Sequence, residues 1–259
     1  MTLKKAEDKN RLSITLVLLM SLFLPLLSLY ATEFVKDGLV AFYTFDEGTV
    51  KGDSLKDVFG KSDAKIIGSL KPVAGKIGQA MECNGKKNYI EIPKLGAWKQ
   101  ASVECWVMEK RFNAIQGIVS TWQWAAGKVH FKFEGGEIQV HKNDGVKIRM
   151  KCKEKRWYHV VYTSNSASGD DPKSLKLYVD GKLIQEGKAG KTPENMDERR
   201  IGAEHNGRYL DGMIDEVRIY DRVLTTDEVI NNSKVISNAT TSVDARSKLA
   251  TTWGKMKNR

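Results

Sequence analysis

The sequence of 259 residues predicts an all-β fold, a sandwich of two antiparallel sheets followed by a short helix. From about residue 36, segments of alternating apolar and polar residues are separated by turns that contain glycine, a pattern typical of strands. Two tight hairpins are expected, in residues 129–142 around Gly135 and in residues 175–185 around Asp180 and Gly181. No stretch before about residue 225 has sustained helical periodicity, so the sheets must bury their apolar faces against each other.

The other elements follow from local sequence. Residues 39–45 and 214–219 are densely apolar, which indicates strands inside a sheet. Residues 224–234 predict the closing helix, capped by Thr225 or Thr226, with acidic residues at the positive end of its dipole. The polar stretches 163–173 and 188–199 are predicted to be exposed connections.

Both ends of the chain are expected to lie outside this domain. Residues 1–31 begin with basic residues and continue into an uncharged, leucine-rich run, typical of a signal peptide or of an uncleaved membrane anchor. Either alternative predicts an exported protein, secreted or held at the cell surface. Residues 238–259 form a polar, basic tail, and the two terminal stretches carry most of the net charge of +10. No nucleic-acid partner is expected.

Three cysteines, Cys83, Cys105 and Cys152, are an odd number for an exported chain. Each lies in an apolar strand-like setting, where cysteine commonly packs as a small buried hydrophobe. A disulfide between Cys83 and Cys105 is the alternative. Zinc is not expected, because the histidines are scattered and there is no Cys-x-x-Cys pair.

Several phrases of the chain occur in the order seen in LamG-like jelly-roll domains of the concanavalin A-like lectin/glucanase superfamily. The resemblance covers roughly residues 36–232 and implies a jelly-roll sandwich with its first and last strands side by side. The phrases are GLVAFYTFDEG (38–48), AGKIGQAMECNGKKNYIEI (74–92), SVECWV (102–107), WYHVVYT (157–163), LKLYVDGKL (175–183) and LDGMIDEVRIYDRVL (210–224).

Catalytic residues of the related glucanases are not recognisable in this chain. Those enzymes carry carboxylates at alternate positions of one strand, the spacing that glycoside hydrolysis requires. The nearest acidic groups, in residues 194–198 and at Asp215 and Glu216, have a different spacing, and there is no Gly-x-Ser-x-Gly motif. We therefore expect a protein that is not an enzyme.

The same resemblance implies one structural calcium ion. The matching positions here are Asp57 in an early loop and Asp215 at the start of the final strand. Carboxylates and backbone carbonyls are suitable ligands for calcium. The alternative is that Asp57 is an ordinary turn residue and that Asp215 is a partner of Arg218 or of loop amides.

Aromatic residues near loops are the candidate ligand-binding residues, because sugar rings stack on exposed aromatic side chains. Trp122 and Trp124 would share a face if their segment is a strand, although core packing is an equally good interpretation. Tyr209, near Arg208 and His205, is a candidate for the rim of a site.

The sequence thus predicts a secreted or surface-held module that binds a glycan or an extracellular protein. A hydrolase with unrecognised catalytic residues is one alternative. Polyanion binding is another, supported by cationic residues that could form one basic face, although a solvated outer sheet face is also consistent with them. These residues are Arg111, Lys128, Lys132, Lys142, Lys147, Arg149, Lys151, Lys153 and Lys155.

Overall fold

A computed structural model describes residues 33–205 and 207–235. The predicted signal or anchor, residues 1–31, and the tail, residues 238–259, lie outside the described residues. Within the described ranges, no helix has the length and apolar character needed to cross a membrane.

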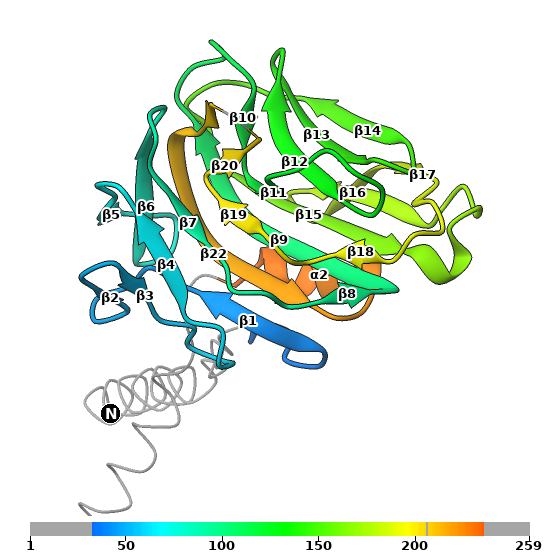
Figure 1. Ribbon diagram of the computed structural model, residues 1–259, viewed down its shortest axis with the longest axis horizontal. Coiled ribbons are helices and arrows are strands. Elements are labelled where there is room, and N and C mark those ends of the chain that lie inside the picture. The colour runs from blue at the N-terminus through cyan, green and yellow to red at the C-terminus, as the bar shows by residue number, and fades with distance from the viewer. Residues whose placement is uncertain (1–32, 206, 236–259) are drawn as a thin grey trace, which may run out of the picture. The chain divides into compact units, whose positions relative to one another are not determined.

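The larger layer is an eight-stranded antiparallel sheet with the order β17-β16-β15-β9-β22-β6-β5, and β1 also pairs with β22 (Figure 1). Its strands are β1 (Leu39–Tyr43), β5 (Lys71–Ala74), β6 (Gln79–Asn84), β9 (Gln100–Glu109), β15 (Tyr158–Asn165), β16 (Leu175–Val179), β17 (Lys182–Gly187) and β22 (Asp211–Tyr220). The first and last strands are therefore neighbours, as predicted. A bulge in β22 between Asp215 and Arg218 separates its pairing with β6 from its pairing with β1.

The second layer consists of two sheets that meet where β11 lies beside β12. One sheet contains β2 (Val50–Lys51), β3 (Ser54–Leu55), β4 (Ala64–Ile67), β7 (Tyr89–Glu91), β19 (Arg199–Ile201) and β11 (Val119–Thr121). The other contains β10 (Gln116–Gly117), β12 (Val129–Glu134), β13 (Glu137–Lys142) and β14 (Lys147–Lys151). Short pairs join β8 (Ala97–Trp98) to β18 (Glu194–Asn195) and β20 (Ala203–Glu204) to β21 (Arg208–Tyr209), and a 3-10 turn spans Ser166–Ser168.

The main core lies between the two layers and explains which side chains face outward. On β12, Val129, Phe131 and Phe133 belong to this core, so the alternate residues His130 and Lys132 point to the opposite side. We call this opposite side of the second layer its outer face.

A second apolar cluster joins residues of the large sheet, such as Phe42 and Tyr220, to Val229 of the helix α2 (Thr226–Ser233). The Thr225 hydroxyl accepts a hydrogen bond from the Glu228 N–H, while the Glu228 carboxylate accepts one from the Thr225 N–H. The sequence prediction of this helix and of both hairpins is confirmed, and Thr225 is the cap.

All three cysteines are free, and β22 separates the strands of Cys83 and Cys105. Two strand spacings amount to about 9.5 Å, beyond the reach of a disulfide. The predictions that residues 163–173 and 188–199 are exposed are both wrong in part. Thr163 and Ser164 belong to β15 and are buried, and Glu194 and Arg199 are completely buried.

Candidate functional site

The two candidate tryptophans lie in a bend that follows β11 on the outer face. They do not belong to a strand, so the condition under which they would share one face is not met. Trp122 is half-buried, whereas Trp124 exposes 54% of its surface. Neither belongs to the core clusters, and both are accessible to a ligand.

Trp122 belongs to a continuous stack of planar side chains. The Arg200 guanidinium lies 3.7 Å from the centre of a Trp122 ring and 4.5 Å from the centre of the Tyr89 ring. Tyr89 in turn stacks on Tyr209, with ring centres 6.0 Å apart and planes inclined by 15°. Cation–π contacts hold such an arginine in one orientation. The stack therefore connects Tyr209 to Trp122 through two residues that the sequence analysis did not identify.

A pocket of about 430 Å³ adjoins the Trp122 end of this stack. Besides Trp122 and Arg200, its walls include the carboxylates of Asp63, Glu91 and Glu198 and the ammonium groups of Lys65 and Lys94. Glu91 accepts a hydrogen bond of 3.3 Å from Arg200. An aromatic wall with several fixed donors and acceptors suits a polyhydroxylated ligand.

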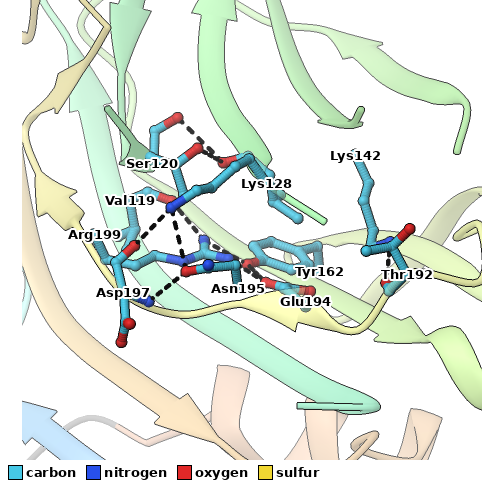
Figure 2. A network of polar contacts seen from close by, with 12 residues as sticks. Val119, Ser120, Lys128, Lys142, Tyr162, Thr192, Glu194, Asn195, Asp197 and Arg199 are labelled. Carbon is cyan, nitrogen blue, oxygen red and sulfur yellow. Dashed lines mark hydrogen bonds and ion pairs between the residues drawn. The ribbon is translucent and has the colours of Figure 1, made fainter. Parts of the chain in front are cut away.

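A buried ion pair supports the strand behind the pocket (Figure 2). Because successive residues of a strand face opposite sides, β19 places Arg200 on the outer face and Arg199 inside the sandwich. Arg199 donates to Glu194 and, at 2.7 Å, to the hydroxyl of Tyr162, which donates to Glu194 at 2.6 Å. This triad anchors β19 and so fixes the position of Arg200.

Lys128, which directly precedes β12, binds the segment of residues 195–198 that leads from β18 to β19 (Figure 2). Its ammonium group, which is almost fully buried, donates to Asn195 Oδ1 at 3.2 Å, the Asp197 carbonyl at 3.4 Å and Glu198 Oε2 at 3.2 Å. Glu198 lines the pocket, so Lys128 has a positioning role rather than contact with a polyanion.

Trp124 forms a second platform. Its rings lie 4.3 Å from His130 and 4.8 Å from His141, measured between ring centres, and these histidines face each other across β12 and β13. Beneath them Glu204 is buried, with its Oε1 atom 2.8 Å from His130 Nδ1 and 2.9 Å from Arg208. Burial lowers the pKa of His141, and the positive charge of Lys132 lowers it further. The two histidine rings thus pack against Trp124, His130 with its plane inclined by 34° and His141 with its plane inclined by 73°.

The nine cations do not form one basic face. Lys128, Lys132 and Lys142 are buried and paired with Glu198, Glu134 and Asp144, and Arg111 and Arg149 also form ion pairs. Charges inside a sheet must be paired, which strand alternation alone does not reveal. Only Lys147, Lys151, Lys153 and Lys155 have no ion-pair partner within the described residues.

The two predicted calcium ligands differ in what their carboxylates do. Asp57 Oδ1 accepts the N–H groups of Phe42, Phe59 and Gly60, and its Oδ2 accepts that of Ser62, so both oxygens are used. Asp215 Oδ2 accepts two amides, from Lys76 and Ile77, but its buried Oδ1 has no hydrogen-bond partner.

Of the two carboxylates, that of Asp215 therefore has an oxygen that fits a calcium ion, whose remaining ligands would be other oxygens such as backbone carbonyls. Residues 33–205 and 207–235 contain no group of three or more histidine, cysteine, aspartate or glutamate side chains placed to hold a metal. The calcium ion stays a prediction.

The comparisons with known proteins agree with this architecture. Residues 84–230 match the family Laminin_G_3, described as the concanavalin A-like lectin/glucanases superfamily. The chain belongs to this family. No match is found among curated proteins.

Solved structures share the fold at low sequence identity. Domain 4 of AbnA, an extracellular arabinanase from Geobacillus stearothermophilus in complex with arabinotriose, is 20% identical, with a TM-score of 0.61 over 75% of this chain and 98% of that domain. Trypanosoma rangeli sialidase in complex with sialic acid is 15% identical, with a TM-score of 0.60 over 77% of this chain but only 33% of its own. The receptor-binding domain of botulinum neurotoxin C/D mosaic serotype is 14% identical, with a TM-score of 0.62 over 77% and 52%.

Proposed function

We propose that this protein is a non-catalytic module that binds carbohydrate through the outer face of its second layer. The observation that carries the proposal is the stack of Trp122, Arg200, Tyr89 and Tyr209 beside the pocket. Sugar rings have apolar faces that pack on aromatic rings, while their hydroxyls need fixed hydrogen-bonding groups. The face offers both, with Trp124 as a second aromatic platform. A protein ligand is the alternative partner.

The pocket carboxylates support binding rather than catalysis. Asp63 accepts the Asp57 N–H, Glu91 pairs with Arg200, and Glu198 pairs with Lys128. Each is thus held as an acceptor for hydroxyl groups.

Relatives of the fold are compatible with this role, since the arabinanase domain is described in complex with arabinotriose and the neurotoxin domain as receptor-binding. An exported location follows from the expectation for residues 1–31.

The test is a glycan-array screen of the full chain, followed by titration calorimetry with the best oligosaccharide. Trp122→Ala and Trp124→Ala should each weaken binding about tenfold, the loss expected for one stacked ring. Phe59→Ala is the matched control, because Phe59 is an exposed aromatic residue that does not line the pocket. Equal loss in the control, or release of reducing sugar by the native protein, would contradict the proposal.

A further inference from the structure

The two layers of the sandwich end in edge strands, β14 and β17, that lie beside each other. The Val146 N–H donates to the Lys188 carbonyl at 3.0 Å, and the Arg149 N–H donates to Gln185 Oε1 at 2.8 Å. A groove of about 540 Å³ lies next to these contacts, lined by residues of both edges. It shares no residue with the Trp122 pocket.

The groove is positively charged. Lys151, Lys153 and Lys182 line it, are exposed, and form no ion pair within the described part of the chain. Its single carboxylate, Asp180, is already bound to Arg156 at 2.9 Å. Lys151 and Lys153 are two of the four cations of the predicted basic face that have no ion-pair partner within the described residues, and Lys182 was not part of that face. Their unbalanced charge favours an anionic ligand.

The groove also has apolar walls and an open strand edge. Met150, Val179 and Ile184 contribute the apolar surface. Leu177 and Tyr178 of β16 pair with Gln185 and Leu183 of β17, so Ile184 is the extra residue of a bulge in β17, and it is 37% exposed.

Along β14, the backbone N–H and C=O groups of successive residues point alternately toward β13 and away from it. The Arg149 N–H points away from β13, toward Gln185, so the backbone groups of Lys151, two residues later, also point away from β13. No hydrogen bond of the Lys151 N–H outside the strand pairing is found among the described residues. The edge thus leaves the backbone N–H of Lys151 for another strand, whereas the N–H groups of Arg149 and Lys153 on either side are bound to the Gln185 and Tyr158 side chains.

We propose that this groove binds an extended acidic segment of a partner polypeptide, added as a strand at the open edge. In an extended chain successive side chains point to opposite sides, so acidic residues can reach the lysines while the alternate apolar residues pack on Met150 and Ile184. A sulfated polysaccharide would satisfy the lysines but has no apolar groups for these walls. The polypeptide is therefore the occupant that uses both features.

The experiment measures fluorescence anisotropy of a labelled peptide of alternating glutamate and valine, titrated with the full chain. Lys151→Glu combined with Lys182→Glu should weaken binding about tenfold. The control is Lys86→Glu combined with Lys87→Glu, which makes the same charge change at exposed lysines outside the groove. Ile184→Ser should weaken binding of this peptide but leave binding of polyglutamate unchanged.

Three results would overturn the proposal: no binding of the alternating peptide, an equal loss in the control variant, or binding of heparin fragments and polyglutamate in preference to the alternating peptide. The last result would identify the groove as a general polyanion site. None of these outcomes bears on the Trp122 face, because the two sites share no residue.

Discussion

Arg199 places a positive charge inside the sandwich, where it is stable only because Glu194 and Tyr162 surround it. Removing one partner of a buried ion pair leaves the other without compensation, which costs about 3–5 kcal/mol. We expect Arg199→Met to lower the free energy of unfolding by that amount, measured by urea denaturation.

The double variant Arg199→Met, Glu194→Met serves as the control, because it removes both charges and should lose much less stability than the single variant. A single variant that loses under about 1 kcal/mol, the value of an exposed pair, would show that Arg199 is not buried as described. Loss of glycan binding in the single variant alone would support its role in positioning Arg200.

Glu109 gives a prediction of pH dependence. Its side chain is buried, neither carboxylate oxygen has a hydrogen-bond partner, and burial together with the charges of Glu154 and Asp211 raises its pKa from 4.5 to about 8. The folded protein therefore binds more protons than the unfolded chain between these pH values, and stability falls as the pH rises through that window. Glu109→Gln should raise the melting temperature relative to the native protein at pH 8 and leave it unchanged at pH 4. The same shift at both pH values would contradict this assignment.

At the scale of elements, α2 holds the C-terminal end of the domain against the large sheet. Its Asn232 binds Glu104 at 2.8 Å and the Tyr220 hydroxyl at 3.1 Å, and its Oδ1 accepts the Val35 N–H. The short helix depends on its cap, so we expect Thr225→Ala to lower the unfolding free energy by about 1 kcal/mol.

Thr226→Ala is the matched control for this cap, because Thr226 is the neighbouring threonine that the sequence offered as the alternative and it does not accept a bond from the helix backbone. Its loss should be less than half as large. Equal losses in urea denaturation would mean that the capping box does not set the stability of α2.

At the scale of the whole molecule, sequence periodicity predicted the layers and both hairpins because these depend on local alternation. Residue type and position near loops identified Trp122, Trp124 and Tyr209 as candidates, but not the stack that connects Trp122 to Tyr209. That stack depends on partners distant in sequence: Arg200 contacts Trp122 and Tyr89, 78 and 111 positions earlier. The same limit explains Glu194, Arg199 and the buried lysines, whose charges look solvated until their partners are known. Pairing across the fold decides burial here, and one sequence does not show it.

A side chain of the last strand connects it to an early turn of the chain. Asp215 in β22 accepts the amides of Lys76 and Ile77, so it connects the final strand to the turn between β5 and β6, and its buried Oδ1 is the oxygen available to calcium. A ligand that binds only the folded state stabilises it, by about 2.7 kcal/mol at a hundred times its Kd. Calcium should therefore raise the melting temperature of the native protein, a chelator should reverse the rise, and Asp215→Asn should abolish the response. Asp57→Asn should lower the melting temperature equally with and without calcium, because Asp57 binds only backbone amides. If calcium leaves the melting temperature of the native protein unchanged and calorimetry detects no heat of calcium binding, the protein does not bind calcium at this site, and Asp215 serves only as an acceptor of backbone amides.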